Sequence, residues 1–229
     1  MSMNQSGLDR ISWSKALVAC SLLSAGMLGC CSPAPDVAKT GDGRNLRELL
    51  VEKGRSKLSF IETRAAQIKP DPTPEEARSI SEYIRQHPDY TSYIGLLYLR
   101  AKNAEAYRSI DSPIKASVLA SALANLKWLN DWGCLYPSPY DSDSAKELVG
   151  LGSAAVDPLI PLLSDKRRAY LGDFGGSEWS SNSNRFEFRI CDYAYRYVGR
   201  IKNLEPTFKV SIPERDRQIE ELRGKLSGR

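Results

Sequence analysis

The sequence predicts an all-α protein built from antiparallel helix pairs. Between residues 45 and 202, apolar residues recur three and four positions apart, which is the spacing of one face of a helix. Helix-start signals fall between these runs, as at Thr73-Pro74-Glu75-Glu76, where Thr caps, Pro takes the first position and Glu reaches back to the cap. Prolines and Gly152 separate the runs, so the chain is expected to turn back on itself repeatedly.

The predicted elements follow the apolar runs in order. The predicted helices begin, in chain order, at Asn45, Pro74, Thr91 (as cap), Ser112, Ser144, Ala154, Phe186 and Pro213. A long polar loop occupies residues 165–185, and 208–212 is predicted as a short strand. The last helix, 213–229, is highly charged and is expected to lie at the periphery, because only Ile219, Leu222 and Leu226 are apolar along it.

The segment from Ala145 to Asp165 resembles a HEAT repeat of the type found in phycobilisome-lyase-like proteins. Leu148 faces inward from its first helix, Gly152 makes the turn, and Leu159 and Leu163 belong to the inner face of its second helix. The resemblance extends over residues 144–202, with 165–185 as an insertion. It implies stacked helix pairs, each of which needs a neighbour to cover its apolar face.

The beginning of the chain has the layout of a secretory signal. Residues 1–15 carry Arg10 and Lys15, and the run 16–29 is apolar or small. The run ends at Met27-Leu28-Gly29-Cys30, which resembles a bacterial lipoprotein signal. It is shorter than the roughly 20 residues of a membrane-spanning helix. An uncleaved anchor that reaches back to Ile11 and a buried helix of the globular domain are the alternatives.

The resemblance to a lipoprotein implies three parts and a location. Residues 1–29 are the signal peptide, 30–43 a tether that begins at the lipidated Cys30, and 44–212 the helical domain. Two or three acyl chains on Cys30 would anchor the protein durably. We therefore expect it in the bacterial cell envelope, attached to a membrane, either at the outer membrane on the periplasmic side or at the cell surface.

Composition narrows the partners. The formal net charge is +4 and the chain has no block of basic residues, so nucleic acid is not expected as a partner. No cofactor is expected either. The chain as a whole looks like uncharacterised bacterial lipoproteins with one helical domain.

Two cysteines lie in the body of the domain. Cys134 and Cys191 are far apart in sequence, and an exported compartment permits a disulfide between them. Such a bridge would stabilise the fold by about 2–4 kcal/mol. The alternative is two buried free thiols.

Aromatic and acidic residues gather in the loops near these cysteines. A bridge between Cys134 and Cys191 would force them together, and such a set could bind a sugar ring or a protein loop. The candidate surface residues are Asp131, Trp132, Tyr136, Tyr140, Trp179 and Asp192. Trp132 and Trp179 are the best candidates for a surface role because both lie on predicted loops. Ordinary core packing is the alternative for the set and is the commoner fate of aromatic residues.

Other chemistry finds little support. His87 is the only histidine and precedes a proline at a predicted helix end, so a capping position is favoured over a catalytic triad. No zinc or calcium spacing is present, and Asp141 and Asp143 are interpreted as helix capping residues.

These observations predict a non-enzymatic envelope lipoprotein whose helical domain binds another envelope protein. The second hypothesis is a carbohydrate or peptidoglycan binder that uses the aromatic loop. The third and weakest is a hydrolase that uses two carboxylates, Asp131 and Asp192.

Overall fold

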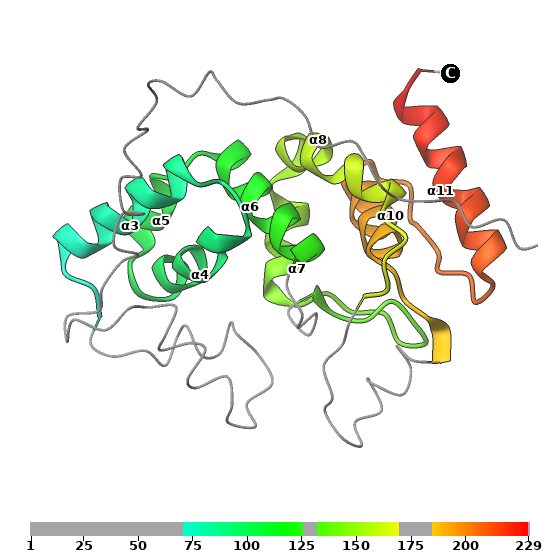
Figure 1. Cartoon of the computed structure of the whole chain (residues 1–229), viewed down its shortest axis with the longest axis horizontal. Helices are drawn as coiled ribbons and strands as arrows, with labels where there is room; N and C mark the ends of the chain where they lie inside the picture. The colour runs from blue at the N-terminus through cyan, green and yellow to red at the C-terminus, as the bar shows by residue number, and fades with distance from the viewer. Residues whose placement is uncertain (1–70, 126–131, 170–184, 229) are drawn as a thin grey trace, which may run out of the picture. The chain divides into compact units, whose positions relative to one another are not determined.

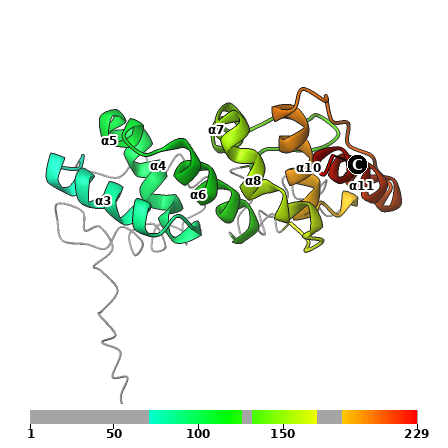
Figure 2. The same cartoon turned by 90° about the horizontal axis from the view of Figure 1, so that it is seen from above.

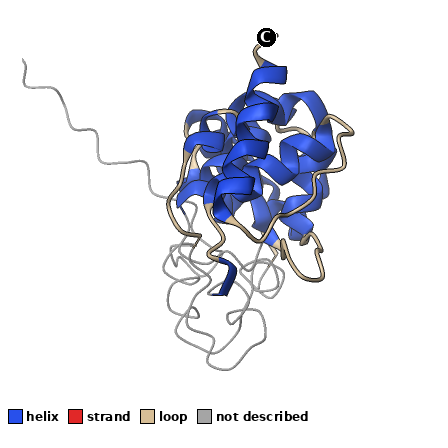
Figure 3. Cartoon of the chain, turned by 90° about the vertical axis from the view of Figure 1, so that its right-hand side faces the viewer, coloured by secondary structure: helices blue, strands red, loops and turns tan. Residues whose placement is uncertain are grey.

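The structure is a computed structural model that describes residues 71–125, 132–169 and 185–228. All of these residues belong to one compact unit, Pro35–Arg229. The described residues form helices and loops and contain no β-strand (Figure 3), which confirms the all-α prediction. The predicted signal, Cys30, the tether and the helix that begins at Asn45 lie outside the described residues.

The helices follow the predicted order (Figure 1). The α-helices are α3 (Pro74–Gln86), α4 (Tyr93–Lys102), α5 (Ala104–Arg108), α6 (Ser112–Asn125), α7 (Asp143–Gly150), α8 (Val156–Leu159), α10 (Ile190–Ile201) and α11 (Ile212–Leu226). Short 3-10 helices are η1 (Tyr90–Ser92), η3 (Gly152–Ala155) and η4 (Pro161–Ser164). Each helix packs mainly on its neighbours in the chain, α3 on α4, α4 on α6, α6 on α7 and α8, and α10 on α7, α8 and α11 (Figure 2).

The start of α3 is formed as the sequence predicts. The Glu76 amide donates to Thr73 Oγ1 at 3.2 Å, and the Thr73 amide donates to the Glu76 carboxylate at 2.7 Å, which completes a capping box. At the other end, His87 is the C-cap, and its amide donates to the carbonyl of Tyr83. The predicted capping position of His87 is confirmed.

The region between α3 and α6 differs from the prediction in two places. Thr91 does not cap α4, because Asp89 caps the preceding η1 by accepting from the Thr91 amide at 2.8 Å, and Ser92, the N-cap residue of α4, makes no side-chain cap bond. Helix α5 was not predicted, since its five residues are too few to show a periodic apolar pattern. Asn103 caps it by accepting from the Ala106 amide at 3.0 Å.

The second helix of the HEAT-like segment is broken into short pieces. Gly152 has a φ of +60° and makes the predicted turn. After it, η3, α8 and η4 succeed one another where one helix was predicted over 154–163. Pro158 and Pro161 each lack an amide hydrogen, so a continuous helix would lose backbone hydrogen bonds there.

The described part of the chain contains no single helix long and apolar enough to cross a membrane. The pair Asp143–Gly150 and Gly152–Ser164 passes a test of length and composition together, but it is bent by 111°.

The ends of the long insertion are held together by backbone hydrogen bonds. The Ala169 amide donates to the Phe188 carbonyl at 2.7 Å, and the amides of Ile190 and Cys191 donate to carbonyls in 165–167. These bonds place the start of α10 against the end of η4.

The predicted strand at 208–212 is wrong. A strand needs a partner with which to exchange backbone hydrogen bonds, and residues 205–210 form none within the described chain. The segment instead leads directly into α11. That helix buries Ile219 and Leu222 as expected, together with Arg215, which was not expected.

Candidate functional site

The loop that follows α6 reaches α10 through a tight backbone turn. The amides of Cys134 and Tyr140 donate to each other's carbonyls at 2.9 and 3.1 Å. Gly133 has a φ of +83°, and a β-carbon there would lie 2.1 Å from the Tyr140 carbonyl oxygen. Only glycine fits this position.

Two tyrosines of α10 dock onto this loop. The Tyr193 hydroxyl donates to the Gly133 carbonyl at 3.3 Å, and the Tyr197 hydroxyl donates to the Trp132 carbonyl. The loop and α10 therefore lie against each other, as the predicted aromatic cluster required. Hydrogen bonds and ring packing bring them together, without a covalent bridge.

The predicted surface role of Trp132 is wrong. Its side chain is 0% exposed and its ring packs 6.1 Å from the ring of Tyr93 and 6.3 Å from that of Tyr197. A position on a loop did not keep the indole in solvent, because the loop itself is covered by α4 and α10. Trp132 is a core residue.

The predicted disulfide is absent. Cys134 and Cys191 are both free and buried. The Cys134 thiol donates to the Tyr136 carbonyl at 3.1 Å. Burial raises the pKa of both thiols, that of Cys191 to about 12. Separation in sequence and an oxidising compartment allow a bridge, but they do not set the distance and direction that a disulfide needs.

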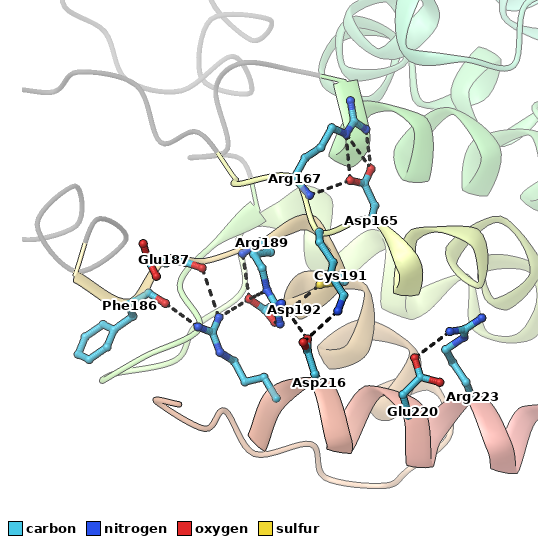
Figure 4. Close-up of polar contacts among 12 residues, drawn as sticks. Asp165, Arg167, Phe186, Glu187, Arg189, Cys191, Asp192, Asp216, Glu220 and Arg223 are labelled. Carbon is cyan, nitrogen blue, oxygen red and sulfur yellow. Dashed lines mark hydrogen bonds and ion pairs between the residues drawn. The ribbon is translucent and has the colours of Figure 1, made fainter. Parts of the chain in front are cut away.

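Asp192 lies at the centre of a buried ionic cluster (Figure 4). It is the third residue of α10, and its carboxylate accepts from the Arg189 amide at 2.9 Å, the reciprocal half of a capping box. The Arg189 guanidinium reaches the same carboxylate at 3.0 Å. The Arg215 guanidinium binds it from α11. Asp192 was predicted as a surface ligand-binding residue, and its burial contradicts that prediction.

The Arg215 guanidinium contacts four partners. Besides Asp192, it donates to the carbonyls of Phe186 at 2.9 Å and Glu187 at 3.4 Å. Its guanidinium lies 4.8 Å from the centre of the Phe208 ring. Arg215 is only 3% exposed. These contacts replace water at its two terminal nitrogens, while its buried Nε makes no hydrogen bond. We call these four partners of Arg215 the guanidinium pocket.

Asp216 extends the cluster toward solvent. Arg189 reaches it at 2.8 Å and Lys166 at 3.0 Å. Partial burial alone would raise the pKa of Asp216, but the hydrogen bonds from Lys166 and Arg189 outweigh burial and lower it. Helix α11 is thus joined by charge to both the start of α10 and the segment after η4.

A second buried carboxylate is neutralised in the same manner. Asp141, interpreted from the sequence as a capping residue, pairs instead with Arg196 at 3.0 Å and with Arg200. The cap of α7 is Ser142, whose hydroxyl accepts from the Ala145 amide at 3.4 Å. Asp141 therefore ties the loop to α10. Among the residues that the structure describes, its carboxylate belongs to no group that could hold a metal ion.

The remaining predicted site residues have mixed outcomes. Tyr136 packs edge-on against Phe186 at 4.8 Å and is partly buried. Tyr140 is 38% exposed and is the candidate that a ligand can reach. Asp131 and Trp179 lie outside the described residues. Trp132 and Asp192 therefore leave the predicted ligand-binding set, and Tyr140 is its exposed member within the described ranges.

Sequence reasoning missed Arg189, Arg215 and Asp216. A signal for Arg215 was present, because it precedes Ile219 by four residues and Leu222 by seven. That spacing places an arginine on the buried face of α11. A buried arginine requires a carboxylate partner, and Asp192 opens the adjacent helix.

Within 71–125, 132–169 and 185–228, no group of three or more His, Cys, Asp or Glu side chains could hold a metal ion. No family model matches the chain, and neither a curated protein nor a solved structure matches it.

Proposed function

We propose that the protein is a lipid-anchored lipoprotein of the bacterial envelope whose helical domain binds another envelope protein. One observation carries the choice between the hypotheses. Trp132 and Asp192, on which ligand binding or hydrolysis depended, are consumed by contacts inside the fold. The contacts of Trp132 and Asp192 hold α10 against its neighbours. The exposed surface of the helices is therefore the part of the domain that we propose for binding.

The anchor rests on the sequence alone. The apolar run 16–29 and Cys30 are the features that support it. A helical domain tethered by 30–43 can search for partners near the membrane, and stacked helices offer an extended surface for protein contacts. This part of the proposal is an analogy at the level of the fold.

The experiment is an in-cell cross-linking pull-down of the tagged full chain, run beside Cys30→Ala. The expected result is a partner that is recovered with the original chain and lost with Cys30→Ala, which also moves to the soluble fraction. Cys31→Ala is the matched control, because it removes the neighbouring thiol and keeps the lipidation position. Identical fractionation of all three forms would overturn the anchor, and recovery of no partner protein would overturn the interaction role.

The exposed Tyr140 favours glycan binding as the second candidate. It predicts that peptidoglycan fragments change tryptophan fluorescence and that Tyr140→Ala removes the change. Tyr90→Ala is the control, because Tyr90 is similarly exposed but lies in η1, before α4. If both variants keep the same fluorescence response to the fragments as the original chain, a glycan site at Tyr140 is excluded.

A further inference from the structure

Helix α11 is attached to the rest of the domain by few apolar contacts. Over its 15 residues, only Ile219 and Leu222 are buried apolar side chains, and Leu226 packs at the margin. The main neighbour of α11 is α10. Its position therefore depends strongly on the polar contacts of Arg215 and Asp216.

These polar contacts form a specific socket. The guanidinium pocket supplies a carboxylate, two carbonyl oxygens and an aromatic face to Arg215. Next to it, Arg189 and Lys166 receive Asp216. We call the guanidinium pocket together with Arg189 and Lys166 the socket. A helix fills it when it carries an Arg-Asp pair with apolar residues four and seven positions after the arginine. The chain's own α11 has this pattern, and any second copy of the chain carries an identical one.

The connection that holds α11 in place is short and strained. Helix α10 ends at Ile201, and Pro206 already packs against Gly199, so residues 202–205 form the hinge. Asn203, with a φ of +55°, belongs to the C-cap of α10, because its amide donates to the Arg200 carbonyl at 3.0 Å and the Leu204 amide donates to the Gly199 carbonyl at 2.8 Å. The strain lies at Glu205, whose φ of +44° is costly for glutamate. Short strained hinges favour the exchange of an element between copies, because the strain is released when the hinge extends.

We propose that the segment 206–228 is exchanged between two copies of the chain, so that Arg215 of each copy binds Asp192 and the carbonyls of Phe186 and Glu187 of the other, while Phe208 moves with its own α11. The exchange keeps every contact of Arg215, Asp216, Ile219 and Leu222 and closes with two-fold symmetry. It replaces the left-handed conformation of Glu205 with an extended one. The proposal is independent of the lipid anchor and of any partner protein.

The test uses two differently tagged full chains, co-expressed and purified through one tag in mild detergent. The variants are Asp192→Asn, which alters the pocket, and Arg215→Ala, which alters the helix. When one chain carries each change, exchange creates one intact socket and one socket that lacks both partners. When both chains carry the same change, every socket has one unpaired group, which is the costly arrangement.

The expected result is that the mixed pair co-purifies about tenfold more than either matched pair, because one unpaired buried charge costs at least that factor in stability. Association through any other part of the chain would be equal in all combinations, so equal capture overturns the proposal. Arg223→Ala is the surface control on the same helix. Its partner Glu220 is exposed, and we expect it to behave like the original chain.

The hinge gives a second test that keeps the socket intact. Glu205→Gly removes the backbone strain of the single copy, in which the chain's own α11 is docked. Exchange then no longer relieves strain in either chain, so co-purification should fall about fivefold or more. Lys209→Gly is the matched control, because Lys209 is exposed in the same connection and has no positive φ, so glycine there adds flexibility without relieving strain. Equal capture of the two variants would overturn the exchange.

Discussion

The central core and α11 are held by different physical means. The central core consists of the buried side chains of α4 and α6 together with Trp132, and it is almost wholly apolar. Helix α11 buries an arginine and two aliphatic side chains. Apolar burial is non-directional and distributed over many contacts, whereas a buried ion pair depends on a few well-placed atoms. A single substitution should therefore weaken the whole domain in the first region and release one helix in the second.

The largest effect is expected at Trp132. Trp132→Ala should lower the free energy of unfolding by about 3–5 kcal/mol, because it empties a site packed by Tyr93 and Tyr197. Urea unfolding followed by circular dichroism measures this loss. Trp132→Phe is the control and should cost much less, since the indole N–H makes no hydrogen bond. A loss below about 1 kcal/mol for Trp132→Ala would contradict its place in the core.

The next effect separates the two regions. Arg215→Ala should cost about 3 kcal/mol of the docking free energy of α11, because Asp192 then faces the Arg189 guanidinium alone and two carbonyls lose their donor. Hydrogen exchange should show faster exchange in 212–226 and little change in α6.

Arg223→Ala is the control for this change. Its side chain is 43% exposed and its ion pair with Glu220 is exposed as well, so the effect should stay within about 0.5 kcal/mol. Equal acceleration in α6 and α11 after Arg215→Ala would show that the two regions unfold together, contrary to the comparison.

The same contrast explains what could be predicted from the sequence. Thr73 and Glu76 fixed the start of α3 because a capping box is a local pattern, and the stripe of α6 predicted a buried helix because apolar spacing is local as well. The fate of Trp132 depends on Tyr197 in α10, 65 residues later. The Asp192–Arg215 pair likewise joins two elements, so only the arginine's place on an apolar stripe pointed toward it.

The candidate site shows the limit of neighbourhood arguments. The sequence placed the loop 132–140 beside α10 by assuming a bridge from Cys134 to Cys191. The neighbourhood is present, but hydroxyl-to-carbonyl bonds from Tyr193 and Tyr197 create it. The assumed disulfide is wrong, but the predicted proximity of the loop and α10 is correct. A disulfide and the observed hydrogen bonds both require these two segments to meet.

A smaller effect tests how tightly the hinge region fits α10. Gly199→Ala should cost about 1–2 kcal/mol, because a β-carbon there would lie 2.7 Å from the Pro206 ring. Gly224→Ala on α11 is the matched control. Apart from the backbone of its own helix, no atom lies within 4 Å of its added β-carbon, so the higher helix propensity of alanine should stabilise the helix by up to about 1 kcal/mol. Thermal unfolding should move in opposite directions for the two variants. A shared direction would contradict the close packing at Pro206.

The smallest effect is the acid sensitivity of α11. Because Lys166 and Arg189 lower the pKa of Asp216 in the folded protein, this carboxylate stabilises docking above the pKa of an unfolded aspartate, about 3.9. The stabilisation is lost as the pH falls from there through the lower pKa of the folded state.

Asp216→Asn should remove part of this dependence and cost under about 1 kcal/mol at pH 7, since the carboxylate is partly exposed. Protease cleavage in 212–226, followed from pH 6 to pH 3, measures it, with Asp143→Asn as the control because the Asp143 pair with Lys146 is exposed and lies on α7. If Asp216→Asn left the acid dependence of α11 unchanged while Asp143→Asn reduced it, the charge contacts of α11 would not be what holds the helix, and its attachment would resemble that of the central core.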